Sequence, residues 1–343
     1  MNYNKIFKRL AVLSIILIYL IIIAGAVVRM TGSGMGCPDW PKCFGYYIPP
    51  TDESQIQWMP DHFYNEGTIV IKDKELRLAK KEFTSTATYN ESNWEPYTKH
   101  DYAEFNVWHT WIEYINRLVT VLSGIPILLL FLLSFRYLKR NKRITALSVL
   151  TVLAMAFQAW LGKIVVDTNL APVRITVHMI VAFLIVAILI AIYYELQDGH
   201  TQIKVSKTFK TLFVFSIFLT LIQVAMGTQV RQYVDEQVKA SLPKSEWLVP
   251  APLIFYVHRS FSVLVVLVNG WLYLQNRALG LRLSGLKWVM YLIIIEILTG
   301  IIMYYFDFPF LSQPLHLVIS SLLFGIQFYI LLKVFYKPNV KLI

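Results

Sequence analysis

The run LAVLSIILIYLIIIAGAVV, residues 10–28, contains no charged residue. A helix needs about 20 mainly apolar residues to cross a bilayer, so this run predicts a membrane-spanning helix. Its basic start and the Ala-Gly-Ala at 24–26 also resemble a secretory signal peptide. The apolar run is longer than the roughly 7 to 15 residues of such a signal, and we interpret it as a retained first span.

Seven further apolar runs of similar length follow along the chain. They cover roughly residues 112–134, 144–166, 174–194, 209–230, 252–274, 286–306 and 312–336. Hydrophobic residues make up 56% of the 343 residues and charged residues only 15%, whereas a soluble domain carries about 25% charge. The sequence therefore predicts an all-α membrane protein with eight transmembrane helices.

The net charge of +11 is concentrated in short connections. Basic residues cluster in 135–143, 195–210 and 275–287, at the N-terminus, and at Lys333, Lys337 and Lys341. Eight alternating spans put all of these on one side, which the positive-inside rule makes cytoplasmic. This distribution is typical of a bacterial-type cell-membrane protein and argues against nucleic-acid binding. The segment 30–107, with 12 acidic and 7 basic residues, is then outside.

The second half of the chain repeats features of the first. Residues 25–29 (GAVVR) align with 227–231 (GTQVR), 113–117 (EYINR) with 255–259 (FYVHR), Gln158 and Gly162 with Glu296 and Gly300, and His178 with His316. Four spans per half is an even number, so both halves have the same orientation. We predict two parallel-repeat four-helix bundles, an N-terminal half at 1–200 and a C-terminal half at 201–343.

Four of the seven histidines fall near the outer ends of the even-numbered helices: His109, His178, His258 and His316. Ionisable residues within spans are costly and usually functional, although a single histidine can also simply bond between helices. Pairs of histidines on facing helices favour axial ligation of haem. Zinc would need three or four clustered ligands, while copper stays an alternative. We predict His258 and His316 as an iron-binding pair.

Several charged residues accompany these histidines. The arginines near the same face are Arg29, Arg117, Arg174, Arg231 and Arg259. They are candidates for binding haem propionates, or for snorkelling to the interface. Glu113 has Phe255 as its counterpart, so an acid in one half only suggests that the first half performs the chemistry. Alternatively, Glu113 pairs with Arg117 at the interface. Glu296 could bond across helices or support the haem site.

The two cysteines, Cys37 and Cys43, lie in the outer segment. An oxidising compartment predicts a disulfide between them. A structural staple and a redox-active bond both fit this pattern.

Together these motifs resemble the haem A synthase family. The resemblance is carried by residues 25–43, 113–118, 226–231 and 258–262, with His178 and His316. It implies oxidation of the ring methyl of haem O to the formyl group of haem A, in two successive steps through an alcohol. It also implies a haem b cofactor between His258 and His316, and a substrate haem in the first half with Glu113 as the essential acid. The expected partners are a haem O synthase, an electron acceptor and further copies of the chain.

Two departures from the family pattern stand out. Asn116 occupies the place of a histidine in Glu-x-x-His-Arg, and an amide is a poor haem ligand. His178 is then the expected substrate-haem ligand, with His109, on the same helix face as Asn116 but about 10 Å further out, as a possible second. The segment 44–107 is longer than the resemblance suggests, and could cap the substrate site or dock a partner.

Two other functions compete with this interpretation. A two-haem electron-transfer cytochrome would explain the paired histidines but not Glu113 in one half. A transporter built from repeats would need matched, interrupted spans, and Gly162 and Gly300 are the nearest candidates for such breaks.

Overall fold

The computed structural model describes residues 3–98, 105–167, 172–197 and 203–335. Its long helices are α1 (Tyr3–Met30), α2 (Val107–Ser134), α3 (Lys142–Asp167), α4 (Pro172–Glu195), α5 (Lys207–Lys239), α6 (Leu253–Ala278), α7 (Gly285–Tyr305) and α8 (Ser312–Phe335). All eight are long and apolar enough to cross a bilayer, which confirms the prediction of an eight-span membrane protein. Lys337, Lys341 and the predicted boundary between residues 200 and 201 lie outside the described residues.

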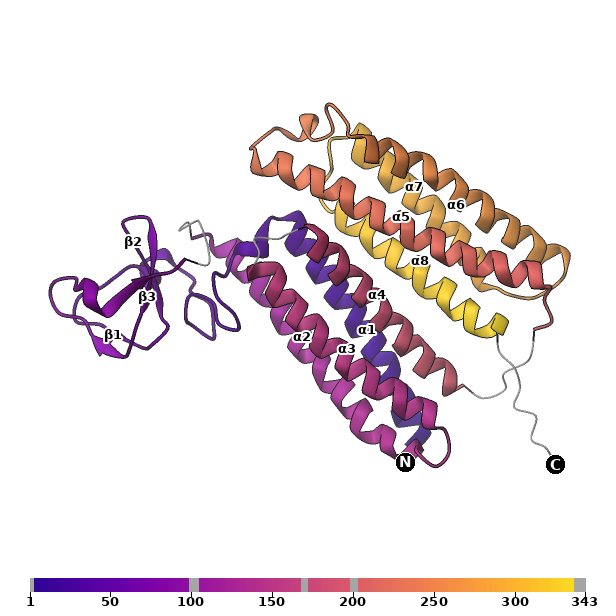
Figure 1. Ribbon diagram of the computed structural model, residues 1–343, viewed down its shortest axis with the longest axis horizontal. Coiled ribbons are helices and arrows are strands. Elements are labelled where there is room, and N and C mark those ends of the chain that lie inside the picture. Colours follow the sequence, from indigo (N-terminus) through magenta and orange to yellow (C-terminus); the bar gives the residue numbers. More distant parts are fainter. Residues whose placement is uncertain (1–2, 99–104, 168–171, 198–202, 336–343) are drawn as a thin grey trace.

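The helices pack in two groups of four around separate apolar cores (Figure 1). Phe7, Leu130, Ile144 and Leu189 contribute to the core of α1–α4, one residue from each helix. The core of α5–α8 also takes in Phe183 of α4, whose ring stacks on Phe324 of α8 at 5.1 Å between centroids. The seam between the groups is formed by α1, α4, α5 and α8. The relation of the groups as a parallel repeat stays a prediction.

Helix α5 is longer than predicted, because the apolar run ends near residue 230 but the helix continues to Lys239. Two interactions support this extension. Arg231 and Asp235 form an i,i+4 ion pair at 2.7 Å, and Val234 is buried in an outer apolar cluster with Leu248. The prediction used hydropathy alone. It therefore missed the last turns of the helix, in which only one face is apolar.

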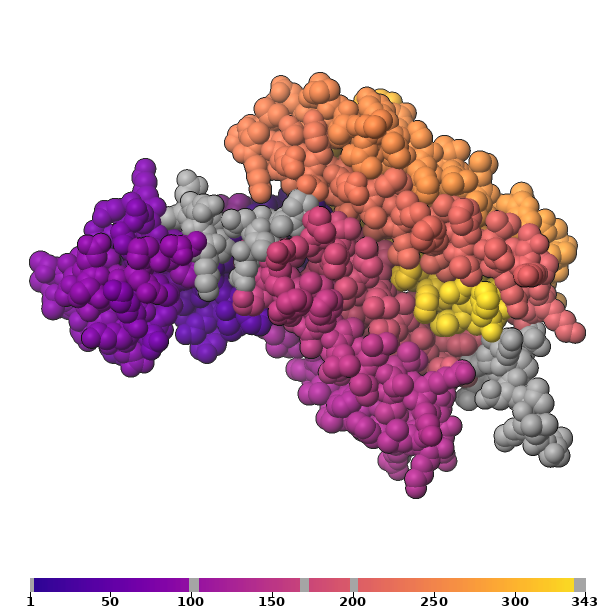
Figure 2. Space-filling view, in the orientation of Figure 1, coloured from indigo at the N-terminus to yellow at the C-terminus, as the bar shows by residue number. Residues whose placement is uncertain are grey.

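The described part of segment 44–107 folds into a small antiparallel β-subdomain that projects beyond the helix ends (Figures 1 and 2). Strand β1 (Phe63–Tyr64) pairs with β4 (Phe83–Thr84), and the second sheet has the order β2 (Ile69–Lys72), β3 (Glu75–Ala79), β5 (Trp94–Pro96). Ile69 lies opposite Leu78 in its register. Tyr64, Val70, Ala79 and Trp94 form a buried core, so most of the unassigned segment 44–107 has a packed structure of its own.

Five short 3₁₀ turns complete the described elements. They are η1 (Ser33–Met35), η2 (Glu53–Ile56), η3 (Glu91–Asn93), η4 (Phe135–Tyr137) and η5 (Lys244–Glu246). The first of them connects α1 to the disulfide loop, and the last lies between α5 and α6.

Candidate functional site

His258 of α6 and His316 of α8 face each other, with 6.5 Å between their ring centroids and 69° between their planes. We call this pair the second-half site. Two imidazoles bound to opposite sides of one metal each place a nitrogen about 2 Å from it, so their ring centres lie roughly 6 to 7 Å apart. The observed separation therefore fits one iron between the two rings. Within the described ranges, no three His, Cys, Asp or Glu side chains gather into a metal site.

The imidazole of His316 is oriented by two neighbours on α7. Its Nδ1 lies 2.8 Å from a carboxylate oxygen of Glu296 and 2.8 Å from the Thr299 hydroxyl. These contacts occupy Nδ1 and leave Nε2 free for a metal. Histidine ligands in proteins commonly use their second ring nitrogen in this way. Glu296, for which the sequence left two roles open, thus contacts a predicted ligand directly.

Each of the four predicted ligand positions, His258, His316, His178 and Asn116, packs against a glycine on the preceding helix. A Cβ added to Gly227 would lie 3.2 Å from Cε1 of His258, and one added to Gly300 would lie 3.8 Å from Cε1 of His316. The corresponding distances are 3.5 Å from Gly162 to Cε1 of His178 and 4.0 Å from Gly25 to Oδ1 of Asn116. Small residues at these four places let the helices approach closely beside the ligand positions.

Glutamine or glutamate stands four residues before three of these glycines. The amide of Gln158 donates to the His178 carbonyl at 3.0 Å, and that of Gln223 donates to the His258 carbonyl at 3.0 Å. Glu296 has the same spacing before Gly300. The alignment of the two halves paired Gln158 with Glu296 but did not identify Gln223. Its four-residue spacing to Gly227 indicates the same role as that of Gln158 before Gly162.

In the first half, the residues at the predicted ligand positions carry buried polar atoms. Asn116 Oδ1 and His178 Nδ1 are both buried and have no hydrogen-bond partner within the described part of the chain. His109 lies in the first turn of α2, where the Asn106 side chain caps its N–H at 3.2 Å. Its backbone packs tightly on the outer loop, since a Cβ at Gly36 would come within 2.4 Å of it.

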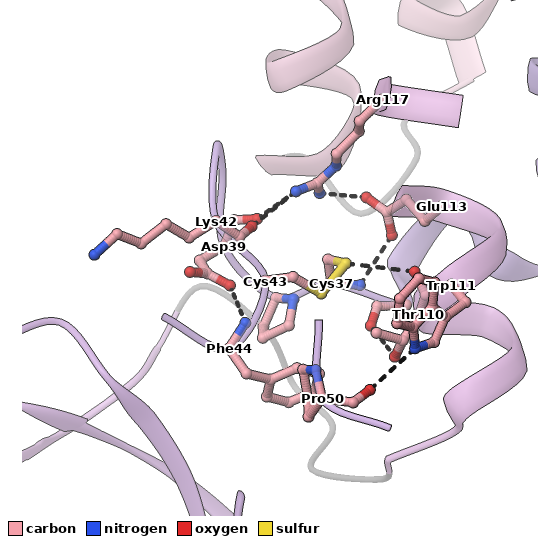
Figure 3. The surroundings of a disulfide bond; sticks show 12 residues. Cys37, Asp39, Lys42, Cys43, Phe44, Pro50, Thr110, Trp111, Glu113 and Arg117 are labelled. Carbon is pink, nitrogen blue, oxygen red and sulfur yellow. Dashed lines mark hydrogen bonds and ion pairs between the residues drawn. A yellow bond between two sulfur atoms is a disulfide. The ribbon is translucent and has the colours of Figure 1, made fainter. Parts of the chain in front are cut away.

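Glu113 is buried, with 3% of its surface exposed, and it is held by the outer loop (Figure 3). One carboxylate oxygen accepts the N–H of Cys37 at 2.9 Å. The other accepts a short hydrogen bond from Arg117. Cys37 is joined to Cys43 by a disulfide, which confirms the predicted pairing. The acid, the disulfide and α2 therefore form one connected group.

Arg117 has three hydrogen-bond acceptors, one on α2 and two in the disulfide loop. Besides Glu113, it donates through Nη1 to the carbonyl oxygens of Asp39 at 2.9 Å and Lys42 at 2.8 Å. These bonds fasten the disulfide loop to α2. The guanidinium that was predicted to bind a propionate therefore already has three protein partners. Such a clamp fixes where the Glu113 carboxylate lies.

Asp39 shapes the same loop from within. Its two carboxylate oxygens accept the N–H groups of Phe44 at 2.6 Å and Gly45 at 2.9 Å. Burial raises the pKa of this carboxyl, while the two hydrogen bonds and nearby Arg117 act to lower it. Gly45 has φ +81°, and a Cβ there would lie 2.6 Å from the Thr68 backbone. Only glycine allows this close approach of the loop to the β-subdomain.

Two of the predicted arginines meet at the seam between the halves. Arg29 at the end of α1 and Arg231 of α5 both pair with Asp235, at 2.8 Å and 2.7 Å. Asp235 was not identified from the sequence, although an acid four residues after an arginine in a helix indicates an ion pair. Arg174 and Arg259, by contrast, are exposed.

The second half carries an apolar cluster rich in aromatic residues beside the α5–α6 connection. Phe255, the counterpart of Glu113, is buried and stacks on Tyr304 with 5.0 Å between ring centroids. It belongs to an apolar cluster with Leu248 and Phe308. The two halves thus differ where the repeat predicts equivalence: an acid with a polar loop in one, and an apolar cap in the other.

The described residues define an integral membrane protein with eight long helices and a pair of facing histidines. A family model described as COX15-CtaA, cytochrome oxidase assembly protein, matches residues 8–328. The chain belongs to this family of cytochrome oxidase assembly proteins.

The curated relatives are distant but extend along most of the chain. A protein named haem A synthase from Wolbachia pipientis wMel is 22% identical over 341 residues, covering 92% of this chain and 89% of that protein. One of the same name from Shouchella clausii is 23% identical and covers 96% and 98%. Another, from Shewanella oneidensis, is 23% identical over 219 residues, which are 63% of this chain and 54% of that protein.

Proposed function

We propose that this chain is a haem A synthase, an oxidoreductase that converts the ring methyl of haem O to the formyl group of haem A. The observation that carries the proposal is the difference between the halves. The second half has two imidazoles 6.5 Å apart under an apolar cap. The first half has His178 and, at the matching place to Phe255, the buried acid Glu113. Family membership and the names of the relatives support this function.

The second half would hold the cofactor, a haem b between His258 and His316. When bound, such a haem would supply one-electron redox chemistry between the substrate and an external acceptor. The protein orients the His316 imidazole through Glu296 and Thr299, and the Phe255 cluster keeps water from this end. Arg231 and Arg259 remain our candidates for its propionates.

The first half would bind haem O, with His178 as the ligand on α4 and with Asn116 and His109 on α2 near the substrate. The methyl would be oxidised in two successive steps through the alcohol, with water supplying the oxygen and the electrons leaving to the external acceptor, and Glu113 would take up protons that these steps release. Cys37 and Arg117 fix the carboxylate by hydrogen bonds, so that it needs little reorganisation during the reaction.

We also propose that both sites lie near the outer face and that both termini are cytoplasmic. The N-terminal end of α1 contacts the basic α2–α3 connection: Tyr137 donates to Asn4 at 2.8 Å, and Arg136 lies 4.7 Å from the Tyr3 ring centre. This group is at the opposite end of the helices from the β-subdomain (Figure 1). Basic residues on that side and a disulfide on the other support this orientation.

The test is pigment analysis in a bacterial strain that makes haem O but has no other haem A synthase. The wild-type chain is expected to produce haem A and to copurify with haem b. Glu113→Gln is expected to keep haem b but to lower haem A formation at least about 100-fold, because the proton acceptor is lost. Glu246→Gln, an exposed acid on η5, is the matched control and should retain full activity.

Two outcomes would refute the proposal. One is a purified wild-type chain without haem. The other is undiminished haem A formation by Glu113→Gln. Recovery of haem b alone, with haem O never converted, would instead indicate a two-haem electron-transfer cytochrome.

A further inference from the structure

Arg29, Arg231 and Asp235 form one ion cluster that joins the two halves. Arg29 reaches Oδ2 of Asp235 from across the seam, through Nε at 3.1 Å and Nη2 at 2.8 Å. Arg231, one turn before Asp235 on α5, reaches Oδ1 at 2.7 Å. The same Arg231 nitrogen also donates to the backbone carbonyl of Arg29 at 3.1 Å. A single carboxylate is therefore shared by an arginine from each half.

Each arginine stands in the same relation to its own half. Arg29 follows Gly25 by four residues, and Arg231 follows Gly227 by four. Four residues advance a helix by about 6 Å and bring the chain back to nearly the same face. Because Gly25 packs on Asn116 and Gly227 on His258, each guanidinium belongs one turn outward of one ligand position.

The cluster has more positive than negative charge. Two guanidinium groups share one carboxylate, and the side chains are only 17% to 28% exposed. In addition, Nη1 of Arg231 is buried and lacks a hydrogen-bond partner in the described ranges. A buried donor without an acceptor is costly, so the unpaired N–H indicates a ligand. An anionic carboxylate, which arginine binds through its planar fork, is the chemical class that fits both the charge and the donor.

We propose that Asp235 is a positioning residue that couples the two haem sites by holding Arg29 and Arg231 ready for haem propionates. This inference rests on the proposed function, since it takes the carboxylate ligand to be part of a bound haem. Within the described ranges, Asp235 is the acid that pairs with both arginines, and the position in the first half equivalent to Asp235 is Ser33. A change at Asp235 should therefore affect both sites at once.

Loss of the Asp235 charge would leave two like charges together at the seam. Added positive charge favours the reduced form of a nearby haem, so the midpoint potential of haem b rises. On the other side of the seam, Arg29 loses its anchor, and the KM for haem O rises by about fivefold or more, a typical size for coupling between two sites.

The experiment uses the full chain purified with haem b, in four forms: wild type, Asp235→Asn, Asp235→Glu and Glu236→Gln. Glu236 is the next residue on α5, is exposed, and bonds only weakly to Gln232, at 3.4 Å. Redox titration and haem O kinetics are expected to show a higher potential and a higher KM in Asp235→Asn. Asp235→Glu should return both values toward those of wild type, and Glu236→Gln should leave them unchanged.

A double variant separates positioning from simple loss of structure. Arg29→Gln with Asp235→Asn removes one charge of each sign, so its haem b potential is expected to lie closer to wild type than that of Asp235→Asn. If Asp235→Asn is too unstable to purify, recovery of folded protein by the double variant supports the coupling. Asp235→Asn that matches Glu236→Gln in both potential and KM overturns the inference alone. A wild-type chain that binds no haem overturns the proposed function together with it.

Discussion

Asp39 is a buried acid whose protonation should affect the stability of the outer loop. Burial raises its pKa above the ordinary value of 3.8. Folding then binds the proton more tightly, so the stability contributed by Asp39 is complete below pH 3.8 and is lost as the pH rises through the folded pKa. We expect unfolding temperatures in detergent to show this loss in wild type, and Asp39→Asn to lack it.

Asp52 offers the opposite sign as a control. Hydrogen bonds from the Ser54 hydroxyl and then from its N–H lower the pKa of this exposed carboxyl. Its contribution is present above the ordinary pKa and is lost as the pH falls through the folded value. Asp52→Asn should therefore remove a loss on the acid side and leave the effect of Asp39 in place. An unchanged pH profile in Asp39→Asn would contradict the assignment.

Sequence comparison identified residues whose chemistry differs between the halves, but not the partners that hold them. Glu113 could be singled out because its counterpart is Phe255, and the cysteine pair followed from composition and topology. The clamp on Arg117 could not be predicted, since its acceptors are the backbone carbonyls of Asp39 and Lys42. Every residue has such a carbonyl, so only the folded loop shows which ones are used.

At the scale of helix pairs, the tightest contact beside a ligand position is between α5 and α6. A Cβ at Gly227 would lie 3.2 Å from Cε1 of His258. An alanine at this position would therefore displace the imidazole by a few tenths of an ångström. We expect Gly227→Ala to weaken haem b binding roughly 10-fold, as changes next to a metal ligand commonly do. Haem titration of the purified chain, followed by its absorption spectrum, measures this effect.

The glycines provide their own controls. A Cβ at Gly270 of α6 would meet nothing within 4 Å, so Gly270→Ala should leave haem b binding unchanged and gain about 0.5–1 kcal/mol in helix stability. Gly300→Ala, at 3.8 Å from His316, should fall between these two. Equal haem affinity in Gly227→Ala and Gly270→Ala would show that close packing on His258 is unimportant.

Elements defined by hydropathy could be predicted, and those defined by local packing could not. The eight apolar runs were sufficient to place the spans, because a bilayer requires about 20 such residues in each. The strands of the β-subdomain have only two to five residues, too few for a clear alternating pattern. The extension of α5 to Lys239 was missed for a similar reason, since Val234 and Leu248 meet only in the folded structure.

For the molecule as a whole, α1 and α8 make one of the close contacts between the two groups of helices. Tyr19 of α1 donates to the Ser321 carbonyl at 3.3 Å, and its hydroxyl lies against Gly325. A Cβ at Gly325 would be 2.3 Å from this oxygen, 3.4 Å from Cδ1 of Ile190 and 3.6 Å from Cζ of Tyr19. Most of the clash would therefore come from one hydroxyl group that can be removed.

This contact predicts a rescue between the halves. Gly325→Ala forces Tyr19 away and should cost about 1–3 kcal/mol, as overpacking commonly does. Tyr19→Phe alone loses one hydrogen bond, about 0.5–1.5 kcal/mol. Combined, the two changes should be more stable than Gly325→Ala alone, because the ring without its hydroxyl leaves room for the methyl group. Denaturant titration of the four forms in detergent measures the coupling. If the two losses of stability simply add, the seam does not pack through these residues. Gly124→Ala is the control: a Cβ there would meet nothing within 4 Å, so this change should show no coupling to Tyr19→Phe.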